Sequence, residues 1–244
     1  MLAQLKYALD ATLAFFYPEV CQVCLAERAT PQEGYLCNSC ASQARPLRPP
    51  RCDVCGRPFA GNISGTFICG DCRETPPKFD YARSVMVFEG PVREAIHQWK
   101  YHQAFWLERR LNAWLCEAAV PALRAGDWHA IVPVPLHSVK QRERGFNQAE
   151  RLARQLSLAV GLPLNTRVLK RVKHTLSQTR LTRHERAANL RGAFAVADGE
   201  RLTGARLVLV DDVMTTGATL DAAATALRRA GAEAVCAWTL ARGM

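Results

Sequence analysis

Long apolar runs are missing from this sequence, since no stretch approaches the roughly 20 apolar residues that a membrane-spanning helix requires. Lys6 and Asp10 interrupt the apolar pattern near the start, so we do not expect the opening segment to be a signal peptide. We expect a soluble, cytoplasmic protein. The opening apolar residues recur every three or four positions, which predicts a short amphipathic helix packed on the body, with a membrane-surface helix as the alternative: Leu2, Leu5, Leu9, Leu13 and Phe16.

Acidic side chains are scarce in one part of the chain. From Lys140 to Arg191 there are three acids against 13 lysines and arginines, an excess equal to the net charge of +10 of the whole chain. A positive field concentrated in one segment favours phosphate-bearing partners, either a polyphosphate ligand or a nucleic-acid backbone. The alternative is a solvated face that only keeps the protein in solution.

Cysteine, in contrast, is abundant and regularly spaced. Two pairs with two residues between the partners can close a tetrahedron around one Zn²⁺, with metal–sulfur distances of about 2.3 Å. A disulfide framework would also give an even count, but the absence of an export signal and a reducing cytoplasm disfavour it. Eight of the ten cysteines form such pairs and predict two zinc sites: Cys21, Cys24, Cys37, Cys40, Cys52, Cys55, Cys69 and Cys72.

The order in which the pairs combine is open between two arrangements. Sequential pairing gives two consecutive zinc ribbons and is favoured, because a short apolar stretch precedes the second pair of each quartet. Alternate pairing would give a cross-brace. A site with four sulfur ligands has no open position, so both zinc ions are expected to be structural. Cys116 and Cys236 lack this spacing and are expected to be small buried residues.

The rest of the chain alternates strands and helices. A stretch rich in Pro and charge, residues 73–84, predicts a linker, so we place a boundary between an N-terminal zinc-binding domain, 1–76, and a second domain, 77–244. Strands that are apolar on both faces and alternate with helices predict an α/β fold with a mostly parallel sheet flanked by helices. The expected strands lie near 81–88, 130–136, 162–170, 207–210 and 234–240, and the expected helices near 91–101, 105–119, 147–161 and 219–230.

The clearest site motif follows the strand expected at 207–210. Two adjacent acids, Asp211 and Asp212, can accept hydrogen bonds from a vicinal diol, directly or around a divalent cation. A turn before the next helix can hold a phosphate at the helix N-terminus. The motif lacks the Lys and Gly spacings of a Walker loop or a dinucleotide fingerprint. A ribose 5-phosphate fits both features, because its diol can meet the two acids and its phosphate can meet the turn. The turn supplies three hydroxyl groups and one residue without a Cβ: Thr215, Thr216, Thr219 and Gly217.

This motif resembles the phosphoribosyl pyrophosphate (PRPP) signature of type I phosphoribosyltransferases. The family's acids contact the ribose hydroxyls and its loop wraps the 5-phosphate, which implies a PRPP-binding set: Asp211, Asp212, Met214, Thr215, Thr216, Gly217, Ala218 and Thr219. The stretch VPVPL resembles the loop that meets the pyrophosphate and Mg²⁺, which implies a second set: Val134, Pro135, Leu136, Arg142 and Arg144. Residues 171–191 are expected to form a mobile loop that folds over the polyphosphate with nearby cations: Lys170, Arg171, Lys173, Arg180 and Arg183.

The resemblance extends over nearly the whole chain and narrows to one family. The cysteine pairs, together with WKYH, VPVPLHSVKQRERGFNQAERLA and TRHERAANLRGAF, are similar to the ComF (ComFC/GntX-like) family of competence-associated proteins. The family implies a double zinc ribbon on a phosphoribosyltransferase fold, linked in several bacteria to DNA uptake or to the handling of single strands. The expected partners are PRPP or another ribose 5-phosphate ligand, single-stranded DNA, and a competence helicase or uptake proteins.

Turnover of PRPP is left open by the sequence. Purine phosphoribosyltransferases carry a carboxylate where Thr215 stands, and a threonine is no general base at neutral pH, so purine salvage is disfavoured. Because the chain ends after the last expected strand, we expect the zinc module to take the place of a base-binding hood. We favour a PRPP-binding protein that serves DNA uptake, with two alternatives: a phosphoribosyltransferase for an unknown acceptor, and a non-catalytic PRPP sensor or scaffold.

Overall fold

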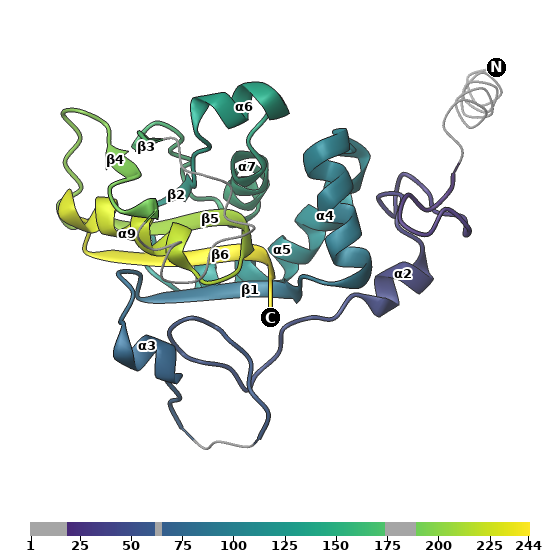
Figure 1. Cartoon of the computed structure of the whole chain (residues 1–244), viewed down its shortest axis with the longest axis horizontal. Coiled ribbons are helices and arrows are strands. Elements are labelled where there is room, and N and C mark those ends of the chain that lie inside the picture. Colours follow the sequence, from purple (N-terminus) through teal and green to yellow (C-terminus); the bar gives the residue numbers. More distant parts are fainter. Residues whose placement is uncertain (1–18, 62–64, 174–188) are drawn as a thin grey trace. The chain divides into compact units, whose positions relative to one another are not determined.

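The computed structural model describes residues 19–61, 65–173 and 189–244 (Figure 1). These residues form two compact units. The smaller unit consists of the described segment up to Ala44 and Glu89–Leu111, and the larger unit consists of Arg45–Phe88 and Asn112–Met244. The expected N-terminal helix and the loop cations Arg180 and Arg183 lie outside the described residues.

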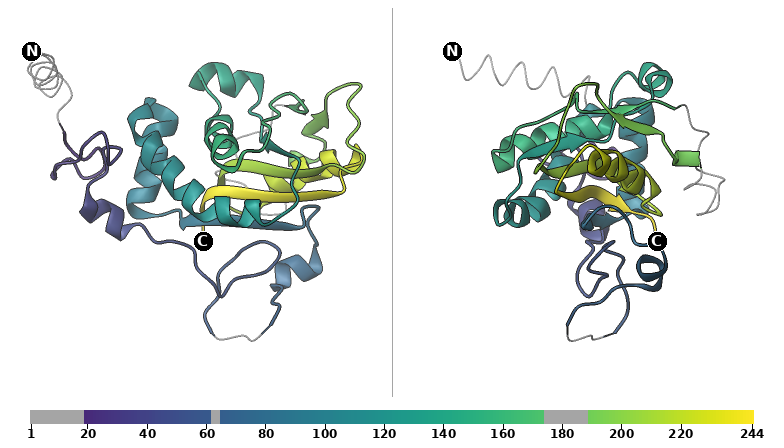
Figure 2. Two further views of the ribbon diagram at one scale, coloured as in Figure 1. Left: turned by 180° about the vertical axis from the view of Figure 1, so that it is seen from behind. Right: turned by 90° about the vertical axis from the view of Figure 1, so that its left-hand side faces the viewer.

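The larger unit is built on a four-stranded parallel sheet with the strand order β1-β6-β5-β2. Figure 2 shows this sheet from behind and from the side. Because β5 and β1 pair with the two sides of β6, all nine residues of β6 are buried. The expected mostly parallel sheet is confirmed. Its strands are β1 (Tyr81–Val87), β2 (Ala130–Pro133), β5 (Arg206–Met214) and β6 (Ala234–Arg242).

Two helices of this unit hold the carboxyl ends of the strands in place. The first is α7 (Gln148–Val160), which packs its apolar face on β2 and β5. It begins where the sequence predicts, because the Asn147 side chain accepts a hydrogen bond from Ala149 N at 3.1 Å, and it ends at Gly161 in the left-handed region. The second is α9 (Ala218–Arg229), which packs on β5 and β6 and connects them.

Two elements of the larger unit differ from the sequence expectation. The residues after β2 form a short helix, α6 (Ser138–Arg144), between the strand expected near 130–136 and the helix expected near 147–161, where the sequence analysis expects no element. None of the residues of α6 is buried, so it lacks the apolar periodicity by which a helix is recognised in a sequence. The short strand expected within 162–170 is shifted to β3 (Leu169–Arg171), and it pairs with β4 (Phe194–Val196) in an antiparallel hairpin.

The second cysteine quartet belongs to this larger unit and is attached to its edge strand. Figure 1 shows its helix, α3 (Gly70–Glu74), on the outer side of β1. The N–H of Ala82 in β1 donates to the carbonyl of Val54 at 2.7 Å. Gly56 has a positive φ of 71°, and a Cβ there would lie 2.6 Å from the carbonyl oxygen of Ala82. The loop between Cys52 and Cys55 therefore packs directly on the backbone of β1.

The first cysteine quartet belongs to the smaller unit. Its helix α2 (Asn38–Gln43) packs on α4 (Gly90–His102), and the Gln98 side chain donates to the carbonyl of Gln22 at 2.7 Å. The chain continues through a 3₁₀ turn, η1 (Phe105–Leu107), into α5 (Glu108–Arg124). Hydrogen bonds from Arg109 to Gln32 and from Arg110 to Glu33 join this turn region to the first quartet.

The two compact units divide the chain differently from the boundary expected between residues 76 and 77. Each cysteine quartet is hydrogen-bonded to a different part of the later sequence, the first to α4 and the start of α5, the second to β1 and β6. Long-range contacts of this kind leave no mark on local composition. The division into domains 1–76 and 77–244 stays a prediction.

Candidate functional site

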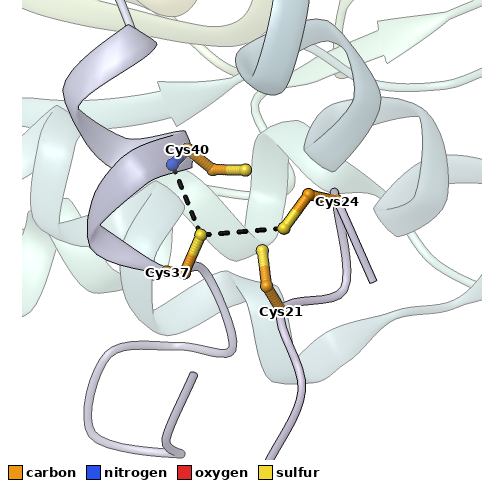
Figure 3. A group of neighbouring side chains, drawn as sticks. All are labelled: Cys21, Cys24, Cys37 and Cys40. Atoms are coloured by element: carbon orange, nitrogen blue, oxygen red, sulfur yellow. Dashed lines mark hydrogen bonds between the residues drawn. The ribbon is translucent and has the colours of Figure 1, made fainter. Parts of the chain in front are cut away.

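The first cysteine quartet has the geometry of a tetrahedral zinc site. Figure 3 shows its four thiols pointing toward one another, and all four sulfur atoms lie within 4.8 Å of each other. The sulfurs of Cys24 and Cys37 are 3.8 Å apart, which matches the edge of about 3.8 Å in a tetrahedron with 2.3 Å bonds. Hydrogen bonds from the backbone N–H groups of Ala26 and Glu27 lower the pKa of Cys24 to about 6 and favour the thiolate that binds metal.

The second quartet repeats this geometry. The sulfurs of Cys52, Cys55, Cys69 and Cys72 lie within 4.8 Å of one another, and those of Cys55 and Cys69 are 3.7 Å apart. Sequential pairing is therefore confirmed over the cross-brace. In each quartet one cysteine sulfur accepts a hydrogen bond from the backbone N–H of another ligand. The N–H of Cys40 donates to the sulfur of Cys37 at 3.4 Å, and the N–H of Cys69 donates to the sulfur of Cys52 at 3.3 Å. Both sites fit a structural Zn²⁺ held by four thiolates.

A buried arginine joins the second zinc site to the sheet. Arg242, at the end of β6, is 6% exposed, and its Nη1 donates to the carbonyl of Cys55 at 2.7 Å. Its Nη2 lies 3.9 Å from the sulfur of Cys55, and Nη1 lies 3.4 Å from the sulfur of Met214. Four thiolates around Zn²⁺ carry a net charge of −2, so this guanidinium stabilises the metal site. Arg242 could not be recognised from the sequence, because 187 positions separate it from Cys55.

The paired aspartates lie inside β5 and not in the loop after it. Successive strand residues point to opposite faces, so Asp211 and Asp212 do not face each other. The sequence placed both acids after the strand expected at 207–210, but the strand extends through them and Asp212 is only 9% exposed. Backbone N–H groups compensate this burial, because Asp211 accepts from Asp212 N at 2.8 Å and Asp212 accepts from Val213 N at 2.5 Å.

The expected phosphate loop is a tight turn between β5 and α9. Gly217, the N-cap of α9, has φ 85°, and a Cβ at this position would lie 2.7 Å from the terminal carbon of Met214. Only glycine fits this turn without a shift of Met214. The turn brings Thr215 and Thr216 next to the N-terminus of α9, and the side chain of Thr215 is exposed. Backbone N–H groups at such a helix start attract anions.

The expected pyrophosphate loop, Val134–Leu136, follows the strand that neighbours β5. The N–H of Val134 donates to the carbonyl of Val210 at 2.9 Å, and the Asn147 side chain donates to the carbonyl of Val134 at 3.1 Å. Asn147 thus fixes this loop to the start of α7. Because β2 and β5 are parallel neighbours, their carboxyl ends bring this loop and Asp211 to the same edge of the sheet.

A cluster of three cations lies at this edge. Burial is the main cause that lowers the pKa of Lys140, and repulsion from Arg171 and Arg144 lowers it further. Burial also lowers the pKa of Arg171, and attraction to Asp211 opposes that shift. Lys140 and Arg144 come from α6 and Arg171 comes from β3, so two elements contribute to the cluster, and Arg171 interacts with Asp211 of β5. Half-buried cations that repel one another are an arrangement suited to a polyanionic ligand.

The comparisons with known proteins agree with this architecture. A model of the double zinc ribbon domain matches residues 12–73, and a model of the phosphoribosyl transferase domain matches residues 142–244. The chain is 35% identical to competence protein F of Haemophilus influenzae, over 85% of this chain and 90% of that protein. The chain belongs to the ComF family.

Other ComF relatives are similar over most of their length. The DNA utilization protein YhgH of Salmonella typhi is 33% identical over 92% of this chain and 97% of its own, and competence protein ComFC of Bacillus subtilis is 29% identical over 85% and 84%. A purine phosphoribosyltransferase of Pyrococcus horikoshii aligns at 19% identity over 57% of this chain and 83% of its own, with a TM-score of 0.36.

The other cations that the sequence assigned to the site lie elsewhere or are exposed. Lys170 is exposed and, as the neighbour of Arg171 in β3, points to the opposite face. Lys173 donates to the carbonyl of Arg191 at 3.0 Å. Arg142 is exposed on α6. In this ComF chain, Arg171 is therefore the one described cation of the expected loop that the fold brings within electrostatic reach of Asp211.

Lys140 is a site residue that was not predicted from the sequence. It lies one turn before Arg144 on α6, and recognising that helix would have placed both side chains on one face.

Among the residues that the structure describes, no helix is long and apolar enough to cross a membrane.

Proposed function

We propose that this ComF chain binds PRPP with Mg²⁺ at the carboxyl edge of its parallel sheet. The observation that carries the proposal is that Asp211, which precedes the phosphate loop in β5, lies within electrostatic reach of Arg171 of the cation cluster. The 5-phosphate binds the turn Thr215–Thr219 and the N-terminus of α9. The pyrophosphate binds Lys140, Arg144 and Arg171, which are the half-buried cations of this edge.

The ribose hydroxyls and the metal ion are assigned to the two aspartates. Carboxylate oxygens are the ligands that Mg²⁺ prefers, and a Mg²⁺ ion supplies positive charge that balances a pyrophosphate group. Asp211 lies within electrostatic reach of Arg171, so it faces the side on which the pyrophosphate is placed. Asp212 is held by the backbone N–H of Val213, which fixes the direction of its carboxylate.

Titration calorimetry with PRPP in the presence of Mg²⁺ tests this assignment. The double substitution Asp211→Asn with Asp212→Asn should weaken PRPP binding about tenfold or more, which corresponds to about 1.4 kcal/mol. Asp198→Asn serves as the control, because Asp198 is an exposed acid outside the site. Absence of PRPP binding to the unaltered protein, or equal binding by the double variant, would refute the proposal.

We propose further that the protein serves the use of DNA and handles single strands. The names of its relatives, competence protein F and DNA utilization protein, support this role, as does the basic excess from Lys140 to Arg191. Binding to a single-stranded oligonucleotide should weaken as salt rises and should drop when Arg142, Arg180 and Arg183 become alanine. Arg201→Ala, an exposed arginine outside the segment, is the control. Lack of binding at low salt contradicts this role.

Transfer of the phosphoribosyl group to an acceptor is a second candidate function. A cleft opens beside Thr215, which leaves space for an acceptor next to the phosphate loop. Thr215 supplies no general base, so a purine acceptor is disfavoured. Release of pyrophosphate from PRPP in a cell extract fraction would establish an enzyme. If PRPP binds and no fraction supports its breakdown, the protein is a non-catalytic sensor.

A further inference from the structure

A segment rich in arginine and proline, residues 45–51, leads into the second zinc ribbon of the larger unit. Two backbone hydrogen bonds attach it to the outermost strand of the sheet. The N–H of Val87 donates to the carbonyl of Arg45 at 2.8 Å, and the N–H of Leu47 donates to the carbonyl of Val85 at 2.7 Å. The segment therefore follows the outer side of β1.

Proline gives this segment a fixed path. Its prolines have φ angles set by their rings and carry no N–H that could pair with another strand: Pro46, Pro49 and Pro50. Pro46 lies opposite Met86 in an antiparallel bridge. The side chains of the segment are thus presented from a backbone that is ordered before a ligand binds, which lowers the cost of binding.

Arginines of this segment and of β1 form a row along the side of the sheet. Arg51 lies within electrostatic reach of Arg83 in β1 and repels its charge. The Arg83 side chain is fixed, because it donates to the carbonyls of Asp53 and Ala82, both at 2.9 Å. We call this row the arginine strip, with two exposed and two half-buried members: Arg45, Arg48, Arg51 and Arg83.

Acidic side chains near the arginine strip are few. Asp53 is the one acid among residues 45–58, and its carboxylate also accepts the N–H of Phe67 at 2.5 Å. The next arginine along the chain, Arg57, is paired with Asp71 at 3.0 Å. Four arginines against one carboxylate leave an excess of positive charge along an extended segment. Such a row attracts a linear polyanion, such as the phosphate backbone of a nucleic acid.

Aromatic rings of the second ribbon lie beside the arginine strip. The N–H of Phe59 donates to the carbonyl of Pro50 at 3.3 Å, which places Phe59 next to Arg51. The rings of Phe59 and Phe67 have centroids 4.1 Å apart, and both side chains are half-buried. Bases of a single strand stack on such rings, whereas bases of a duplex stack on one another. Cations next to aromatic rings therefore favour a single strand over a duplex or a lipid surface.

We propose that the arginine strip and the Phe59 ring bind the phosphates and bases of a single-stranded nucleic acid. The inference rests on the proposed handling of single strands and assigns it an interface outside the basic segment from Lys140 to Arg191. β1 and β2 are the outermost strands on opposite sides of the sheet. The arginine strip follows β1, whereas α6 with its cations follows β2. The protein can therefore hold a strand and PRPP at the same time.

Fluorescence anisotropy of a labelled oligothymidine tests the arginine strip in the zinc-loaded protein. Arg48→Ala with Arg51→Ala should weaken binding about tenfold or more. It should also reduce the slope of log affinity against log salt by about 1.4, since each phosphate contact with a single strand contributes about 0.7. The matched control is Arg93→Ala with Arg201→Ala, which removes the same charge from two exposed arginines outside both basic regions. Equal affinities and equal slopes for these two variants overturn the proposal.

A charge-preserving variant separates the loss of charge from a loss of folding. Arg48→Lys with Arg51→Lys should bind the oligothymidine within about threefold of the unaltered protein, because the phosphate contacts depend on positive charge. A loss as large as that of the alanine variant would show that the substitutions act through the fold, which overturns the proposal.

The role of the ring is tested separately. Phe59→Leu keeps an apolar side chain and removes the stacking surface, so it should weaken oligothymidine binding about fivefold or more without a change in the salt slope. Phe105→Leu, at an exposed ring of the smaller unit, is the control. Equal binding by the two leucine variants would remove Phe59 from the interface.

The same titrations separate this inference from the proposed function. If the substitutions at Arg142, Arg180 and Arg183 weaken binding and those at Arg48 and Arg51 do not, the arginine strip is refuted and the handling of single strands stands. Lack of binding by the unaltered protein at low salt refutes both. Binding through Arg48 and Arg51 to vesicles of phosphatidylserine and phosphatidylcholine, with none to the oligothymidine, would overturn the assignment to a nucleic acid.

Discussion

Replacing Arg242 with methionine removes the connection between the second zinc site and the sheet. The guanidinium is 6% exposed and donates at 2.7 Å to the carbonyl of Cys55. Losing a charge-assisted hydrogen bond costs about 1.5–3 kcal/mol, and a carbonyl left buried without a donor costs about 1–3 kcal/mol. These costs overlap, and methionine fills much of the same volume. We expect the free energy of unfolding of the larger unit to fall by about 2–4 kcal/mol.

A thermal melt of the zinc-loaded protein measures this loss. For a unit of this size, 2–4 kcal/mol corresponds to a fall in melting temperature of about 5–15 °C. Arg154→Met is the control, because Arg154 forms an exposed ion pair with Glu150 at 3.0 Å within α7, worth about 0.3–0.5 kcal/mol. A chromogenic chelator should also remove one of the two zinc ions faster from Arg242→Met. Equal melting temperatures and equal zinc release for the two variants would refute the role of Arg242.

Three further substitutions test other parts of the structure. Cys72→Ser should lower both zinc content and PRPP affinity, whereas Cys40→Ser should lower zinc content alone. The reason is that only the second ribbon belongs to the same compact unit as the phosphate loop. Equal PRPP affinities of the two variants would contradict this prediction. Lys140→Met should weaken the binding of inorganic pyrophosphate about tenfold, with Lys173→Met as the control. In the unaltered protein, the affinity for pyrophosphate should fall as pH rises through the lowered pKa of Lys140, because the ammonium group loses its charge. Gly217→Ala should destabilise the fold by about 1–2 kcal/mol in chemical unfolding, because φ is 85° and Met214 must move; an unchanged midpoint would argue against a turn that only glycine fits.

The metal sites and the sheet could be predicted because their signals are local. Two residues between paired cysteines set the turn that holds two ligands, and both quartets are formed as the spacing favours. The strand near 207–210 and the cap at Asn147 are also local patterns, and β5 and α7 are found there. Strands that are apolar on both faces predicted the parallel sheet for the same reason.

Other parts of the site depend on contacts that no local pattern records. β5 continues through both aspartates because β6 supplies partners as far as Arg242, so Asp212 is buried inside a strand that was expected to end at residue 210. α6 has no apolar face, so the helix that carries Lys140 was not expected. Attachment of the second ribbon to β1 and β6 requires residues far apart in the sequence.

A crystal structure with PRPP and Mg²⁺ tests the central claim most directly. We predict the 5-phosphate on the turn Thr215–Thr219, the ribose hydroxyls at the two aspartates, and the pyrophosphate against Lys140, Arg144 and Arg171. A PRPP molecule whose pyrophosphate lies away from these cations, or no PRPP at the carboxyl edge of the sheet, would contradict the proposed function.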